Sequence, residues 1–99
     1  MLTHSLLARI SGSPAEAYTW AHEAAALVSR KTGVKINVSS RLGGPPEIMW
    51  ISQHDDLPSF QKAQAVAGSD ADCARMLEGA REKHLFDATS IDTAFWLPI

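Results

Sequence analysis

His54 is the side chain in this sequence best suited to proton transfer, because imidazole titrates near neutral pH. Asp55 and Asp56 follow it directly, and a neighbouring carboxylate can hold an imidazole in one tautomer. The alternative is that His54 ends a strand while the two aspartates cap the next helix, as turn chemistry alone would produce. Metal coordination by these three residues is not expected, since consecutive side chains diverge and no third remote ligand is identifiable.

Two arginines are candidates for binding an anionic group. Arg41 and Arg9 each present a rigid fork of donors that matches a carboxylate or a phosphate. The alternative is that both guanidinium groups are solvated or pair with Glu47 or Asp92 on a neighbouring strand. Ligand binding gains support if the arginines share a sheet face with an aromatic side chain.

Aromatic and amide side chains complete the candidate binding groups. Trp50 and Trp96 are both suited to stacking on a flat organic substrate. Such aromatic residues also bury interface area and anchor dimers, and this is the role we favour for Trp96. Asn37 offers an amide that can polarise a substrate carbonyl.

The elements that must position these residues follow from the periodicity of the sequence. Apolar and polar residues alternate from Leu2 to Ile10, which predicts a first strand. A capping box that begins at Ser13, with proline at the first helical position, predicts the start of a helix. Its apolar stripe continues until Gly33, which offers a left-handed stop.

The second half of the chain predicts a hairpin, a helical region and a last strand. The hairpin consists of a strand over residues 34–42, a turn at Gly43–Pro46 and a strand that resumes at 48–51. A helical region, kinked or in two parts, follows over about 57–85, and residues 89–97 form the last strand. This order is that of a ferredoxin-like βαββαβ sandwich, an α+β fold with one antiparallel four-stranded sheet and its helices on a single face.

The register of the hairpin decides which side chains share a face, because a slip of one residue exchanges the faces of a strand. If Gly43–Pro46 is a four-residue loop, Val38 lies opposite Ile51 and Ser39 opposite Trp50. The helix-covered face then receives Ile36, Val38, Met49 and Ile51. The uncovered face receives Asn37, Ser39, Arg41, Trp50, Ser52 and His54 from the hairpin. The first strand adds Ser5, Leu7 and Arg9 to this face, and the last strand adds Asp92 and Trp96.

This mixed aromatic and polar face is the predicted site. Two such faces can enclose a cavity when two copies of the chain associate. The predicted catalytic residues are His54 and Asn37, and the predicted substrate-binding residues are Arg41, Trp50, Arg9 and Asp92.

The order of the elements, with the hairpin followed by a helix, resembles the dimeric α+β barrel superfamily, which includes NIPSNAP-type and antibiotic-biosynthesis-monooxygenase-type domains. Residues 43–52, then Asp55, Asp56 and Leu57 and a helix carrying Phe60, are similar to NIPSNAP-like small bacterial proteins. The resemblance implies a homodimer with pockets between each sheet and its helices or at the sheet interface. Members include cofactor-free oxygenases, haem degraders, isomerases and proteins without known activity.

Among the activities found in that superfamily, haem degradation is not expected for this sequence. The haem-degrading members carry an Asn on the first strand and a His on the second helix. This sequence has no Asn on its predicted first strand and no His early in its predicted second helix.

Composition sets further limits. The 99 residues, 45% hydrophobic and 20% charged, are typical of one globular domain spanning 1–99. A formal charge of −2 provides no basic field for nucleic acid or an anionic membrane. The single cysteine, Cys73, excludes an intrachain disulfide, and the longest aliphatic run is far too short to cross a bilayer. We therefore expect a soluble cytoplasmic protein with neither nucleic acid nor membrane as a partner.

These patterns predict a homodimer that binds a small organic ligand without a cofactor. The resemblance to the dimeric α+β barrels implies the activity of a cofactor-free oxygenase or isomerase, acting on an aromatic or carbonyl compound. The alternative is a non-catalytic interaction or accessory module in which dimer packing fills the uncovered face. The sequence contains no glycine-rich phosphate loop and no Gly-x-Ser-x-Gly elbow, so no motif decides whether the protein is an enzyme.

Overall fold

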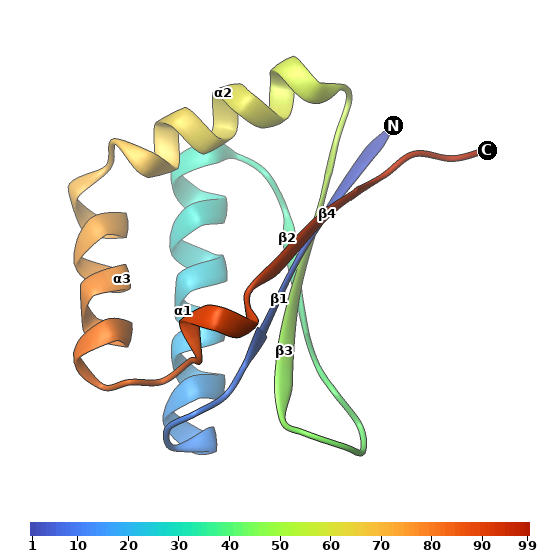
Figure 1. The fold of residues 1–99 in the computed structure, drawn as a ribbon. Coiled ribbons are helices and arrows are strands. Elements are labelled where there is room, and N and C mark those ends of the chain that lie inside the picture. The colour runs from blue at the N-terminus through green and yellow to red at the C-terminus, as the bar shows by residue number, and fades with distance from the viewer.

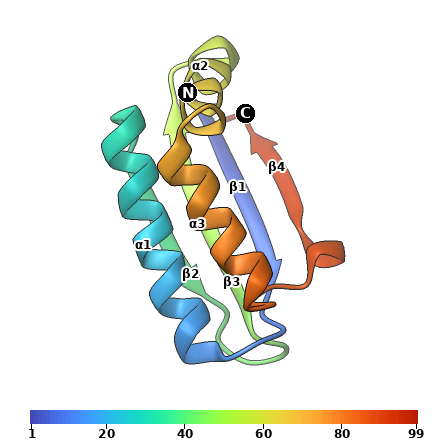
Figure 2. The ribbon, with the colours of Figure 1, turned by 90° about the vertical axis from the view of Figure 1, so that its left-hand side faces the viewer.

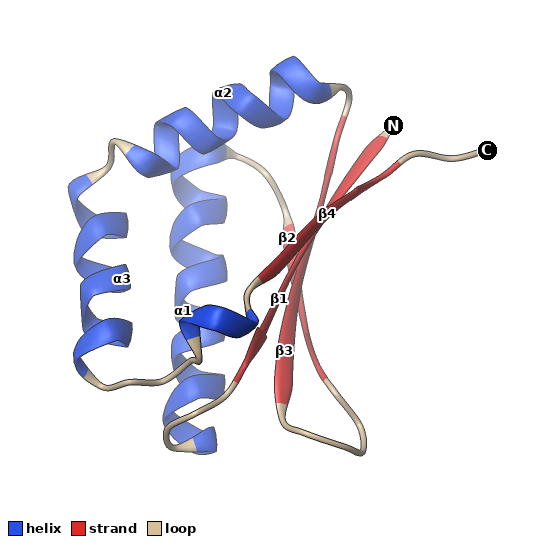
Figure 3. Cartoon of the chain, viewed as in Figure 1, coloured by secondary structure: helices blue, strands red, loops and turns tan.

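A computed structural model describes all of residues 1–99, arranged as a four-stranded antiparallel sheet with three α-helices on one face (Figures 1 and 3). The elements are β1 (Leu2–Arg9), α1 (Pro14–Thr32), β2 (Ile36–Ser40), β3 (Glu47–His54), α2 (Leu57–Gly68), α3 (Ala71–Glu82), a short 3₁₀ helix η1 (Ala88–Ser90) and β4 (Asp92–Trp96). The strand order in the sheet is β2-β3-β1-β4. The predicted ferredoxin-like α+β fold is confirmed.

Local capping interactions define where α1 begins and ends. The Ser13 hydroxyl accepts a hydrogen bond from the Glu16 N–H at 3.3 Å, and Pro14 occupies the first turn. At the other end Gly33 adopts φ 75°, and its N–H donates to the Ser29 carbonyl at 2.8 Å. The sequence predicted both boundaries because each depends on local chemistry alone.

The helical region after the hairpin is divided in two, as predicted. The Asp56 carboxylate caps α2 by accepting from the Ser59 N–H at 2.8 Å, and Asp70 caps α3 by accepting from the Cys73 N–H at 3.0 Å. α1 and α3 stand side by side over the sheet, and α2 crosses near one end of both (Figures 1 and 2). No helix has the length and apolar character needed to cross a membrane.

The last strand begins three residues later than predicted, at Asp92 rather than at residue 89. The reason is local hydrogen bonding. The Asp87 carboxylate accepts hydrogen bonds from the N–H and the hydroxyl of Thr89, at 3.0 and 2.7 Å. These bonds turn the chain into η1 before it can extend.

The hairpin register is one residue away from the predicted register. Val38 lies opposite Trp50, not opposite Ile51. The Arg41 N–H donates to the Glu47 carbonyl at 2.9 Å, so the loop that closes the hairpin is residues 42–46, one residue longer than predicted. A loop of odd length moves β3 by one position and exchanges its two faces.

The prediction for the faces of β3 was therefore wrong. Trp50, Ser52 and His54 point toward the helices, whereas Met49 and Ile51 lie on the uncovered face. The predicted faces of the other strands are confirmed, except that β2 is shorter than the predicted strand over 34–42 and ends at Ser40, before Arg41. The uncovered face also carries Asn37, Ser39, Ser5, Leu7, Arg9, Asp92 and Trp96.

Candidate functional site

A cavity of about 590 Å³ lies between the sheet and the three helices. Alanines of α1 form part of its wall, and buried Ala17 and Ala21 pack with Ile10 and Ile48 in the core beside it. Small side chains let α1 approach the sheet closely at that point, while α2 and α3 contribute residues to the remaining walls of the cavity. The lining is mostly apolar, which is typical of a pocket for a small organic molecule.

Three aromatic side chains form one wall of the cavity. Trp20, Trp50 and Phe86 meet edge to face, with ring centroids 5.4 to 6.2 Å apart. The indole N–H of Trp20 donates to the Met76 carbonyl at 2.9 Å, and that of Trp50 donates to the Ala21 carbonyl at 3.2 Å. Both indole donors are thus occupied by the backbone, so these rings offer a ligand apolar surface rather than hydrogen bonds.

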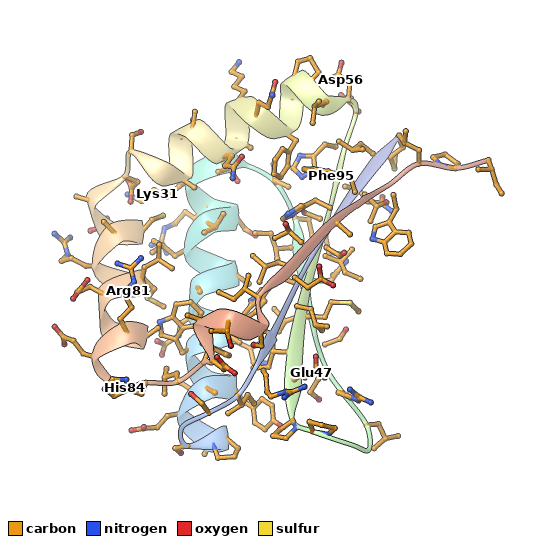
Figure 4. The ribbon with its side chains drawn as sticks, viewed as in Figure 1. Lys31, Glu47, Asp56, Arg81, His84 and Phe95 are labelled. Carbon is orange, nitrogen blue, oxygen red and sulfur yellow. The ribbon has the colours of Figure 1, made fainter.

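Two histidines lie together at the polar end of the cavity. His4 on β1 is paired with Ser52 on β3, and the Ser52 hydroxyl lies 2.9 Å from His54 Nε2. Phe60 on α2 packs on both imidazoles, with centroid distances of 4.7 Å to His4 and 5.1 Å to His54. Phe95 on β4 packs on His4 at 5.2 Å (Figure 4). His4, Ser52 and His54 are called the histidine cluster below.

Burial changes the acid–base properties of two cavity side chains. It lowers the pKa of His4 below the ordinary value of 6.5, and the neighbouring His54 lowers this pKa further. Burial also raises the pKa of the Cys73 thiol, and the nearby Asp70 carboxylate raises it further. His4 is therefore neutral at pH 7, and Cys73 is a protonated thiol without nucleophilic character. No group of three His, Cys, Asp or Glu side chains is placed to hold a metal ion.

The structure brings together only two of the six predicted site residues. His54 and Trp50 line the cavity, on the opposite side of the sheet from their predicted position. Asn37, Arg9 and Asp92 lie on the uncovered face and do not reach the cavity. The catalytic role expected for Asn37 and the binding roles expected for Arg9 and Asp92 therefore stay predictions, and they concern the uncovered face rather than the cavity.

Arg41 is not on a sheet face at all. It follows the end of β2, directly before the hairpin loop, and its Nη1 pairs with Glu47 Oε1 at 2.6 Å. Glu47 is at the end of β3 opposite to Phe95 and the histidine cluster (Figure 4). This pairing is the alternative that the sequence left open for Arg41.

Sequence reasoning did not select His4, Ser52 or Phe60 as site residues. A signal for His4 and Ser52 was nevertheless present. His4 is in phase with the apolar residues Leu2 and Leu6, and Ser52 is in phase with Trp50 when β3 is read with a period of two. A polar residue in phase with the buried side of a strand must find a partner or a ligand there.

Comparison with known proteins identifies the fold. No family model matches the sequence, and no curated protein matches it. Among solved structures, a NIPSNAP domain protein from Burkholderia xenovorans has a TM-score of 0.81 at 11% identity, covering 100% of this chain and 95% of that one. A NIPSNAP family protein from Agrobacterium tumefaciens has a TM-score of 0.80 at 16% identity, covering 99% and 92%.

A third structure is the cofactor-independent oxygenase SnoaB from Streptomyces nogalater, with a TM-score of 0.74 at 15% identity, covering 99% of this chain and 92% of that one. This chain shares its α+β fold with these three structures. The predicted resemblance to NIPSNAP-type and monooxygenase-type α+β barrels is confirmed at the level of fold. Identities of this size carry the α+β barrel architecture alone, so the chemistry must be argued from the cavity.

Proposed function

We propose that the cavity binds a small, mostly apolar organic molecule with an aromatic or carbonyl group. One observation carries this proposal: an apolar space of about 590 Å³ walled by aromatic rings and reached by two imidazoles. Pockets that bind small molecules commonly have this size and this combination of apolar walls with few polar groups. An aromatic ligand would pack on Trp20 and Trp50 and place its polar group near the histidine cluster.

The chemistry that we propose is proton transfer without a cofactor. In the tautomer in which His54 Nε2 donates to the Ser52 hydroxyl, at 2.9 Å, Nδ1 is left to accept a proton from the ligand. Removal of a proton beside a carbonyl, or from a phenol, leaves an electron-rich carbon. Return of the proton to another carbon is an isomerisation. Transfer of one electron from that carbon to O₂, followed by formation of a carbon–oxygen bond between the resulting carbon radical and superoxide, gives a peroxide and is an oxygenation. The shared fold with the cofactor-independent oxygenase SnoaB supports this class of reaction.

We also propose that the protein is a homodimer joined through the uncovered sheet face. In the non-catalytic alternative, dimer packing fills the face that would otherwise bind a ligand. The cavity, however, lies on the opposite side of the sheet from Leu7, Ile51 and Trp96. Association through those residues leaves the cavity open, which favours ligand binding over a purely structural module.

Ligand binding is tested in a Trp96→Phe background, in which the remaining tryptophans, Trp20 and Trp50, both line the cavity. We expect 2-tetralone, a bicyclic aromatic ketone, to quench their fluorescence saturably and to raise the Tm. Ala24→Phe places a ring inside the cavity and should weaken the affinity about tenfold or more. Ala26→Phe, on the exposed side of the same helix, should not. Absence of binding by 2-tetralone and related bicyclic ketones and phenols overturns the proposal.

Proton transfer is tested by deuterium exchange at the acidic α-carbon of 2-tetralone in D₂O, followed by NMR. The protein should accelerate exchange, and His54→Gln should lower that acceleration about a hundredfold. His22→Gln is the matched control, because His22 is exposed on α1 and does not line this cavity. Exchange of the bound ketone at the rate seen in buffer would refute proton transfer while leaving the binding proposal in place.

A further inference from the structure

The cavity lining has an unusual balance of charge. Its titratable side chains are His4, His54 and Arg81 with the thiol of Cys73, and no Asp or Glu contributes to it. The whole chain, in contrast, has eleven acidic residues against nine Lys and Arg. The lining of this cavity therefore holds only groups that are neutral or positive at neutral pH.

The His4 ring is held by packing rather than by hydrogen bonds. Phe60 and Phe95 pack against it at 4.7 and 5.2 Å, and they are 4.9 Å from each other. Its nitrogens make no hydrogen bond within the protein, and neither is sealed away from solvent-sized molecules. The ring orientation is thus set in advance, while its donor and acceptor atoms remain available to a ligand.

The groups around the histidine cluster do not compensate a positive charge there. α2 contributes the Phe60 ring and the uncharged amide of Gln64, β4 contributes the Phe95 ring, and β3 contributes the Ser52 hydroxyl. Arg81 is the only charged side chain that the helices add to the lining. The nearest acidic residues in the sequence, Asp55 and Asp56, are exposed. A protonated imidazole in the cluster would therefore be buried without a counter-ion.

We propose that the histidine cluster recognises a carboxylate, so that the ligand is an apolar monocarboxylic acid whose head lies against His4 and whose body fills the aromatic part of the cavity. This inference rests on the proposed binding function and names the ligand class. A carboxylate supplies the counter-ion that the lining lacks, and it forms a charge-assisted hydrogen bond with the imidazolium. His54 remains bonded to Ser52 and retains the role of proton carrier.

Binding of such an acid is coupled to uptake of a proton. Burial and the nearby His54 keep the pKa of His4 low in the empty cavity, so the ring is neutral at pH 7. A bound carboxylate favours the imidazolium and raises this pKa. Binding of the acid near neutral pH is therefore accompanied by uptake of a proton by His4. Affinity for the acid should increase as the pH falls from 8 to 6, whereas a neutral ligand of the same shape should show no such trend.

The experiment compares 2-naphthoic acid with 2-naphthamide by isothermal titration calorimetry at pH 6, 7 and 8, in buffers of different ionisation enthalpy. At pH 6 we expect the acid to bind about tenfold more tightly than the amide. The preference should shrink at pH 8, and proton uptake should accompany binding of the acid alone. His4→Gln should abolish the preference and the proton uptake while the amide still binds. His22→Gln should change neither.

Arg81 provides the competing explanation and its own test. Its side chain is 76% exposed and lies 3.7 Å from the Glu78 carboxylate, and its charge does not change between pH 6 and 8. A preference that is lost in Arg81→Gln, retained in His4→Gln and independent of pH would overturn the proposal. Equal affinities for acid and amide would also overturn it and leave the binding function standing. Failure of both compounds and of 2-tetralone would remove the binding function itself.

Discussion

His4 links the pH dependence of folding to a single residue of the cavity. Its pKa in the folded chain lies below the ordinary value of 6.5, first because of burial and then because of His54. Below about that pH the unfolded chain binds a proton that the folded chain resists, so the free energy of unfolding decreases as the pH falls. The stabilisation is fully present above pH 6.5 and is lost progressively below it.

His4→Phe should therefore reduce the loss of stability on acidification. The substitution keeps a ring between Phe60 and Phe95 and removes the titrating group. Thermal unfolding of the ligand-free protein at pH 7.5 and 5.5 should show a smaller decrease in Tm for this variant than for the wild type. The exposed control, His22→Gln, should keep the wild-type decrease. Identical decreases in all three proteins would show that His4 does not carry the effect.

At the scale of elements, local signals predicted boundaries well and failed where a loop length had to be guessed. Ser13 and Gly33 mark the ends of α1 through bonds to their own neighbours, so the sequence contains all the information needed. The hairpin register depends instead on whether the loop has four or five residues. Gly43 and Gly44 both adopt positive φ, 82° and 78°, which lets the chain close with the extra residue.

The extra residue in the hairpin loop explains why only part of the candidate site was predicted. His54 and Trp50 were recognised by residue type, which does not depend on the register. Ser52 was correctly predicted to share their face, but the companions from neighbouring strands were misassigned: the predicted face held Asn37 and Arg41, and the observed face holds His4. Residue chemistry is encoded locally, whereas the composition of a site depends on pairing between distant strands.

Two glycines test how backbone conformation contributes to helix stability. Gly33 ends α1 at φ 75°, while Gly79 lies inside α3, and an added Cβ would meet no atom within 4 Å at either position. Gly33→Ala should decrease the free energy of unfolding by about 1 kcal/mol, because a side chain disfavours the left-handed region. Gly79→Ala should increase it by up to about 1 kcal/mol, since alanine favours a helix interior. Urea denaturation of both variants measures these changes, and changes of the same sign would contradict the assignment.

At the scale of the whole molecule, the two faces of the sheet differ in what covers them. The helices lie on one face and no element of the chain covers the other (Figure 1). The cavity lies on the helix-covered face. The uncovered face has Leu7, Met49 and Ile51 on its two central strands, and Trp96 at its edge is 60% exposed. An apolar patch at the centre of a sheet, with polar residues around it, is typical of a protein–protein interface.

The proposed homodimer would use this face, because a two-fold axis would oppose identical central strands and bury both patches together. Trp96 is already oriented along the sheet by a hydrogen bond from its indole N–H to the Ser5 hydroxyl, at 2.9 Å. Light scattering at micromolar concentration should therefore give the mass of a dimer. Ile51→Lys, which would place two ammonium groups near the axis, should give a monomer with unchanged helix content by circular dichroism.

Leu42→Lys is the matched control for this prediction. Leu42 is fully exposed in the hairpin loop, so the substitution introduces the same charge away from the uncovered face. It should remain a dimer. Because the cavity is built within one chain, the monomeric Ile51→Lys variant should still bind 2-tetralone with an affinity within a few-fold of the wild type. A wild-type monomer would refute the dimer, and loss of binding together with loss of the dimer would show that the partner subunit helps to form the cavity.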